Sequence, residues 1–186
     1  MSAKRGPGLS EDLMKMLSEQ KALERLQKIR TDLRSEIVEG FEHRAKSCQT
    51  CDTKGACCLD AHFVNVHISR LEARAIGDIL AAFSNDRKKA VYARIEETIE
   101  KYGLTGNGDT YSQTFACPLF EKGTGCLVHE GGKPLPCITH ACYESAADLP
   151  PEELLAVSEK LVDSLNEQTY GQRKAWLPLP LALKQQ

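Results

Sequence analysis

The eight cysteines of this 186-residue chain fall into two groups. The early group comprises Cys48, Cys51, Cys57 and Cys58, and the late group comprises Cys117, Cys126, Cys137 and Cys142. Thiolates are soft ligands that suit zinc, iron–sulfur clusters and copper(I) better than magnesium or calcium. Cysteine that serves only as a small buried hydrophobe needs no clustering. The pattern therefore predicts a metal centre at which the two groups meet.

The spacing within the early group is typical of a metal half-site. Two residues separate Cys48 from Cys51, which lets both thiolates turn onto one ion in a knuckle, as in zinc and iron–sulfur sites. Adjacent side chains such as those of Cys57 and Cys58 point in different directions. One of these two can ligate while the other serves a second metal, bridges, hydrogen-bonds or stays a thiol.

The late group is more spread out. Cys117 and Cys126 flank a turn-rich connection at 118–125, and His140 stands between Cys137 and Cys142. Eight thiols suffice for two four-ligand sites or for one larger cluster with spare thiols. The sequence leaves open which thiols share an ion.

The histidines give a weaker signal. His129 and His140 lie within the late group and are alternatives as ligands or as hydrogen-bond donors to ligands, but the favoured role is that of a loop histidine that simply forms hydrogen bonds. We expect His62 and His67 at the surface or beside the site, and His43 facing solvent.

Composition argues against the other uses of clustered cysteine. Cysteine makes up about 4% of the chain, whereas small secreted disulfide frameworks reach roughly 8–10%. The chain begins without a secretory-type apolar segment and has no run of 18 apolar residues, so we expect a cytoplasmic protein that does not enter a membrane. In a reducing compartment such thiols favour metal binding over disulfides. A thioredoxin-type pair is disfavoured because no strand-helix-strand unit surrounds the Cys48–Cys51 pair.

Charge and motifs exclude several function classes. The net charge of −2 and the absence of a basic stripe predict no binding to nucleic acid. Hydrolytic triads, phosphate-binding glycine loops and dinucleotide fingerprints are also absent. An ordinary enzyme is therefore disfavoured, while a redox or accessory role through an iron–sulfur cluster stays open.

The elements that would position the cysteines are mainly α-helical. We expect an N-terminal lead and a long amphipathic helix over 1–46, a cysteine-cluster domain with long loops over 47–171, and a Pro/Leu-rich tail over 172–186. A helix from the Ser10 N-cap to Lys46 would span roughly 54 Å, against a radius of gyration of about 16 Å for a domain of this size. Either this helix breaks, or its first half projects onto a partner protein or a second copy.

The remaining pattern predicts an extended segment at 62–68, then a helix after a capping box from Ser69 to Glu72. A second helix begins near Ser84 and ends near Gly103, so that the two form a hairpin. A long loop follows to about 147. A last helix runs from Pro151 to Gly171, and the tail lies over the core or binds a partner. The predicted buried face of the last helix is Leu154, Val157, Leu161, Val162 and Leu165.

Over about residues 48–145 the sequence resembles the YkgJ-type cysteine-cluster family, described as a zinc- or iron-chelating domain. The resemblance rests on C-x2-C-x5-CC at 48–58, Cys-Pro-Leu at 117–119, Gly-Cys-Leu-Val-His-Glu at 125–130, and Lys133-Pro134 before Cys137 and Cys142. The family often has Arg-Pro where Lys133-Pro134 stands, and an arginine where Ile138 stands. The resemblance implies chelation of iron or zinc by the cysteines.

The sequence therefore predicts a metal-binding protein that chelates zinc or iron through two groups of four cysteines. One alternative is an iron–sulfur protein with an electron-transfer or enzyme-accessory role. Another is a protein-interaction module that the metal braces, with the N-terminal helix as its contact surface.

Overall fold

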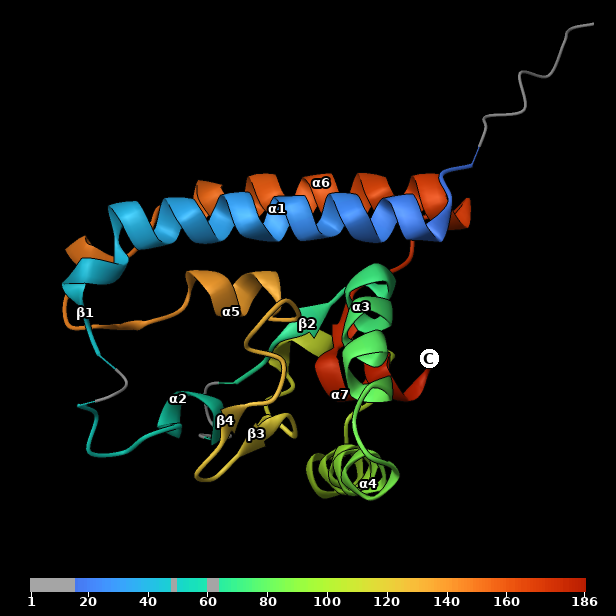
Figure 1. Ribbon diagram of the computed structural model, residues 1–186, viewed down its shortest axis with the longest axis horizontal. Coiled ribbons are helices and arrows are strands. Elements are labelled where there is room, and N and C mark those ends of the chain that lie inside the picture. The colour runs from blue at the N-terminus through green and yellow to red at the C-terminus, as the bar shows by residue number, and fades with distance from the viewer. Residues whose placement is uncertain (1–15, 48–49, 60–63) are drawn as a thin grey trace, which may run out of the picture.

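The fold is mainly helical and includes a long N-terminal helix. The computed structural model describes residues 16–47, 50–59 and 64–186. The α-helices within these ranges are α1 (Glu19–Gly40), α2 (Ala56–Leu59), α3 (Arg70–Ala81), α4 (Asn85–Tyr102), α5 (Leu135–Thr139), α6 (Glu152–Tyr170) and α7 (Leu179–Lys184). Figure 1 shows α1 and α6 side by side as one layer, with α5 and α3 next to it and α4 farthest away.

Short antiparallel strand pairs and 3-10 segments connect the helices. The strand pairs are β1 (Ala45–Lys46) with β5 (Cys142–Tyr143), β2 (His67–Ile68) with β6 (Leu177–Pro178), and β3 (Phe120–Glu121) with β4 (Gly125–Cys126). The 3-10 segments are Glu42–Arg44, Thr110–Ser112 and Ala146–Asp148. None of the described helices is both long enough and apolar enough to cross a lipid bilayer.

The N-terminal helix is shorter than the sequence predicts. It begins at Glu19, where the Ser18 side chain accepts a hydrogen bond from the Lys21 N–H, and it spans 22 residues. The expectation of one helix running to Lys46 is wrong, because residues 16–18 are not helical and a 3-10 turn follows Gly40. The proposed Ser10 cap lies outside the described residues. At about 1.5 Å per residue, α1 is roughly 33 Å long, which fits a compact domain.

The helix α1 packs along α6 instead of projecting. Its entry is held by the Leu17 N–H, which donates to the Gln168 carbonyl at 2.9 Å. One core cluster joins α1 to α5, α6 and the start of α3, and its buried members are Ala22, Leu26, Leu33, Ile37, Leu71, Leu135, Ile138, Val162 and Leu165. The sequence left two alternatives for the N-terminal helix, that it breaks or that its first half projects onto a partner. The structure shows the break.

The buried face of α6 is partly different from the one predicted. Val162 and Leu165 are buried, but Val157 and Leu161 are 57% and 51% exposed, so their assignment to the core is wrong. Ser158 is buried in their place, together with Asn166 and Thr169. The Asn166 side chain belongs inside because its Oδ1 accepts the Leu71 N–H at 3.1 Å and its Nδ2 donates to the Val162 carbonyl.

A second core cluster is built from α3, α4 and α7. The predicted capping box from Ser69 to Glu72 is confirmed, as are the Ser84 N-cap of α4 and its end at Gly103, where φ is +59°. The predicted hairpin is wrong in its packing: Figure 1 shows α3 and α4 at a steep angle, and α7 packs against both. Leu179 and Leu183 of α7 are 1% exposed, so the tail lies in the core.

Candidate metal centre

Seven of the eight predicted ligands lie on short elements between the longer helices. Cys48 and His62 lie outside the described residues. The seven described cysteines are Cys51 in the turn before α2, Cys57 and Cys58 on α2, Cys117 just before β3, Cys126 on β4, Cys137 on α5 and Cys142 on β5. The short helix α5 was missed by the sequence analysis, which treated 103–147 as a loop.

The backbone brings the two cysteine groups together at two places. The Cys117 N–H donates to the Cys58 carbonyl at 2.7 Å, which ties α2 to the chain that enters β3. Lys46, on the strand just before the early group, pairs with Cys142 in the β1–β5 ladder. Figure 1 shows α2 next to β3 and β4. The segments of Cys58 and Cys117 therefore meet through the backbone, whereas a metal centre between the two groups stays a prediction.

A glycine makes the contact between α2 and β3 possible. Gly55 has φ of +86°, a conformation that costs other residues about 1–2 kcal/mol. A Cβ atom built on it would lie 2.0 Å from Cζ of the Phe120 ring. Glycine is thus required at this position both for the backbone turn and for the close approach of the ring.

Cys57 and Cys58 form a hydrogen-bonded pair. The pKa of Cys57 is lowered by its hydrogen bond with Cys58 and by a further one with the His140 side chain. The pKa of Cys58 is raised by its hydrogen bond with Cys57 and by burial. The first proton therefore leaves from Cys57, and Cys58 stabilises the resulting thiolate as a donor. His140 thus acts on a predicted ligand, and whether it binds metal itself stays a prediction.

Cys117, Cys126 and Cys137 are the more enclosed thiols of the late group. Burial raises the pKa of Cys117 to about 12, although the N–H groups of Leu119 and Phe120 donate to its sulfur and lower it in part. Burial also raises the pKa of Cys126, against a hydrogen bond from the Val128 N–H. Burial raises the pKa of Cys137 as well, and the charge of Cys117 adds to this effect.

The sulfurs of five cysteines lie close enough to affect one another's ionisation. Cys117 affects the ionisation of Cys58 and Cys137 and is itself affected by Cys57 and Cys126, so these five form what we call the thiol cluster. Cys51 and Cys142 are placed differently, near the Lys46 ammonium group. The pKa of Lys46 is raised chiefly by its hydrogen bond with Glu144, and Cys142 and Cys51 add smaller effects.

No metal-ligand set is complete among the described residues: within 16–47, 50–59 and 64–186, no three His, Cys, Asp or Glu side chains converge closely enough to hold an ion. No family model, curated protein or solved structure matches the chain. The resemblance to the YkgJ-type family therefore stays a prediction.

The donor set nevertheless suits a soft metal ion. The five thiols of the cluster are linked in their ionisation, and hydrogen bonds from backbone N–H groups partly offset the raised pKa values of two of them, Cys117 and Cys126. Such hydrogen bonds stabilise the thiolate that a metal requires, and they are a usual feature around ligating sulfur. A bound zinc or iron ion would supply the positive charge that these buried sulfurs otherwise lack.

The other histidines lie outside the thiol cluster. His43 is exposed, as expected. His67 is 4% exposed and stacks on Tyr111 with ring centroids 4.1 Å apart, so the first of its two expected positions, at the surface, is wrong. The Nδ1 atom of His67 lies 2.7 Å from the Asn65 carbonyl oxygen. His129 is half exposed and lies with Lys133 on the loop before α5.

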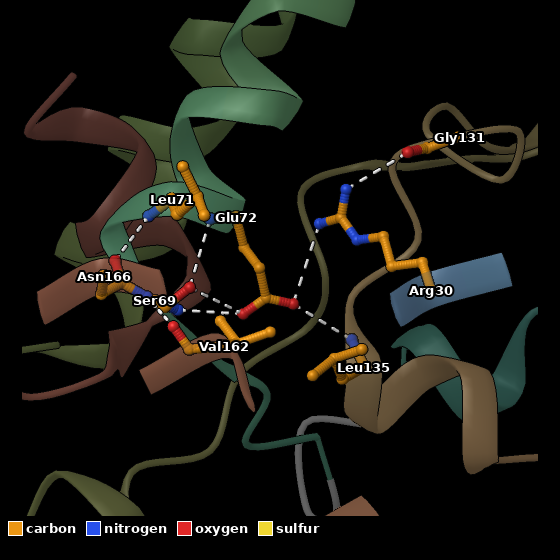
Figure 2. Close-up of polar contacts among 8 residues, drawn as sticks. All are labelled: Arg30, Ser69, Leu71, Glu72, Gly131, Leu135, Val162 and Asn166. Atoms are coloured by element: carbon orange, nitrogen blue, oxygen red, sulfur yellow. Dashed lines mark hydrogen bonds and ion pairs between the residues drawn. The ribbon is translucent and has the colours of Figure 1, made fainter. Parts of the chain in front are cut away.

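A buried polar network positions the start of α5, the helix that carries Cys137, and the sequence analysis missed it (Figure 2). Glu72 Oε1 accepts the Leu135 N–H at 3.2 Å, at the first residue of α5, which carries Cys137. Glu72 Oε2 accepts from both the N–H and the hydroxyl of Ser69, at 3.0 and 3.1 Å. Arg30 of α1 lies 3.7 Å from Glu72 and donates to the Gly131 carbonyl at 3.2 Å.

Proposed function

We propose that this protein binds zinc or iron through its cysteines, with the thiol cluster as the centre of the site. The observation that carries the proposal is the hydrogen bond from the Cys117 N–H to the Cys58 carbonyl at 2.7 Å. It brings the early and late groups to one place without requiring a disulfide. A chain of this length does not need such a concentration of thiols to build a core.

The chemistry of the thiols supports metal binding over packing. Enclosed thiols with raised pKa values are poor ligands until a cation compensates the thiolate charge, and binding then releases protons. The N–H groups of Leu119 and Phe120 lower the pKa of Cys117 in part, and the Val128 N–H does the same for Cys126. If these sulfurs served only in apolar packing, hydrogen-bond donors that stabilise a thiolate would not be needed beside them.

An iron–sulfur cluster is the second candidate. Cysteine is the usual ligand of such clusters, and hydrogen bonds to sulfur are among the factors that set their reduction potential. The donors at Cys117 and Cys126 favour this alternative as much as they favour a single ion. The protein would then carry electrons or assist an enzyme.

Metal and acid-labile sulfide analysis of the full chain, purified without oxygen, tests the proposal. Colourless protein with stoichiometric zinc supports the zinc site. Bound iron without sulfide supports an iron site, and coloured protein with iron and sulfide supports the cluster. Protein that contains neither metal, and takes up neither from buffer after reduction, would overturn the proposal.

Matched variants connect the metal to the thiol cluster. Cys117→Ser removes the sulfur whose ionisation is linked to that of the other four, so we expect the metal content to fall well below that of the parent protein. His140→Ala tests the hydrogen bond to Cys57, and His43→Ala serves as its control because His43 is exposed on another segment. Unchanged metal content in Cys117→Ser would refute a centre at this cluster.

A further inference from the structure

A small hollow lies beside the thiol cluster, between α1 and the segment that runs from His129 to Ala141. Its volume is about 60 Å³, against about 10–15 Å³ for one water molecule, so it has room for about five non-hydrogen atoms. The lining residues are Arg34, Ile37, Val38, Glu42, His129, Lys133, Ile138, His140 and Ala141.

The walls of the hollow carry excess positive charge. Arg34 and Lys133 are permanent cations, and Glu42 is the one carboxylate among the lining residues, which leaves a net charge of +1 from two cations and one anion. Burial lowers the pKa of His129, and the charges of Lys133 and Arg34 lower it further. Both cations therefore lie close enough to the His129 ring to affect its ionisation. Glu42 and Glu130 act on it in the opposite sense, with the Glu130 side chain 85% exposed.

The absence of an ion pair separates these two cations from five of the arginines of the protein. Arg30, Arg74, Arg87, Arg94 and Arg173 each lie within ion-pair distance of a carboxylate. In the part of the chain that the structure describes, neither Arg34 nor Lys133 makes such a pair. A cation at a concave site without a protein partner is a candidate for binding an anionic ligand.

The remaining walls are apolar. Ile37 and Ile138 are buried, with 3% and 7% of their surface exposed, and Val38 and Ala141 complete this part of the lining. Ligand sites commonly combine apolar walls with a few polar groups that fix orientation. A wall of this mixed kind suits a ligand that has one charged end and one short alkyl end, in preference to an inorganic anion that is polar all round.

We propose that this hollow binds a small organic carboxylate of about propionate size, with Arg34 and Lys133 holding the carboxylate. Ile37 and Ile138 contact its alkyl part. The proposal goes beyond metal binding, because no lining residue is a cysteine and occupancy does not depend on a bound ion. His140 both lines the hollow and hydrogen-bonds Cys57, so the ligand would sit next to the thiols.

Propionate titration of the full-length protein, labelled at the isoleucine methyl groups, tests the proposal by NMR. We expect the Ile37 and Ile138 resonances to shift with saturation, and neutral propionamide of the same shape to give no such shift. Arg34→Ala and Lys133→Ala should each weaken propionate binding about tenfold, the loss of one charged hydrogen bond. Arg25→Ala is the control, since Arg25 is exposed on the same helix outside the hollow.

Each alternative outcome would overturn the assignment. Absence of saturable shifts at Ile37 and Ile138 would show that propionate does not bind there. Equal binding of propionamide would show that the cations play no part, and tighter binding of inorganic phosphate would assign the site to an inorganic anion. Unchanged affinity in both Arg34→Ala and Lys133→Ala would also refute it, provided that the methyl spectra show both variants folded.

Discussion

Replacing Glu72 by glutamine removes one buried charge while keeping the size of the side chain. Glu72 is 0% exposed, and its two oxygens accept three hydrogen bonds, from the Ser69 N–H, the Ser69 hydroxyl and the Leu135 N–H. Its partner Arg30 is 4% exposed. The substitution therefore tests whether the network of Figure 2 holds α1, α3 and α5 together.

The expected cost follows from what is left unpaired. The glutamine amide has only one acceptor oxygen, so either the donors of Ser69 or the Leu135 N–H lose their acceptor, at about 1–3 kcal/mol. Arg30 loses its counter-ion inside the protein, and breaking a buried ion pair from one side costs about 3–5 kcal/mol. These two effects overlap, so we expect Glu72→Gln to lower the free energy of unfolding by about 3–5 kcal/mol in total.

Arg30 is poorly compensated even in the parent protein. Its pKa is lowered by burial, which outweighs the opposing effect of Glu72, and its Nε and Nη2 atoms have no hydrogen-bond partner. Arg30→Met removes this cation but leaves Glu72 its three donors, so its cost should be smaller than that of Glu72→Gln. The double variant should be less destabilised than the sum of the single variants, by about 1 kcal/mol or more.

Urea denaturation followed by circular dichroism, at equal metal content, measures these differences. For a domain of this size the Glu72→Gln change corresponds to a fall in Tm of about 10 °C. Glu36→Gln on the exposed face of α1 is the control and should stay within about 0.5 kcal/mol of the parent. A cost below about 1 kcal/mol for Glu72→Gln, or strict additivity in the double variant, would refute the reasoning.

Three further predictions concern backbone, core and thiols. Gly55→Ala should destabilise more than Gly123→Ala, because both glycines have φ near +87° but only Gly55 meets the Phe120 ring; equal free energies of unfolding would contradict this. Val162→Ala should cost about 2 kcal/mol and Val157→Ala less than about 0.5, since only Val162 is buried; urea denaturation that finds equal costs would reverse the assignment of the α6 face. In reduced, metal-free protein, iodoacetamide should modify Cys57 before Cys117, because the pKa of Cys57 is lowered and that of Cys117 is raised to about 12. The rate of modification of Cys57 should also reach its plateau at a lower pH than that of Cys117. Mass spectrometry that shows the opposite order of modification would refute this.

The sequence predicted best those elements whose signals are local. The Ser69 capping box, the Ser84 N-cap and the stop at Gly103 all follow from hydrogen bonds or dihedral angles within a few residues, and all three are confirmed. The packing of these helices was less predictable. The contact of α7 with both α3 and α4 depends on a tail far along the chain, and a short proline-containing helix gives little periodic signal.

The errors on α1 and α6 have a common cause. Residues 10–46 contain no proline, so the apolar periodicity gave no sign that the helix starts after Ser18. On α6 the apolar residues fall on two overlapping faces of the helix. The residue types alone therefore do not indicate whether the face of Val157 or the face of Ser158 is buried. The choice is made by Asn166, which has to reach the Leu71 N–H and so fixes the rotation of the helix.

One signal for the buried network was present in the sequence. Arg30 interrupts the apolar series Leu23, Leu26, Leu33 and Ile37. An arginine at a core position of an otherwise apolar stripe requires a buried carboxylate. The capping-box residue Glu72 could have been considered for that role, but a cap at N3 has an ordinary local explanation, and only the tertiary fold shows its second use.

The network also bears on how the cysteine site is built. Cys137 lies two residues after Leu135, whose N–H is fixed by Glu72 of α3, while Gly131 on the preceding loop is fixed by Arg30 of α1. The segment of Cys137 is therefore held by side chains from outside the cysteine segments, and the N-terminal helix is part of its support. If the proposed metal binds here, Arg30→Met and Glu72→Gln should lower its affinity without removing a single ligand, because ligands that are no longer pre-positioned must be ordered when the ion binds.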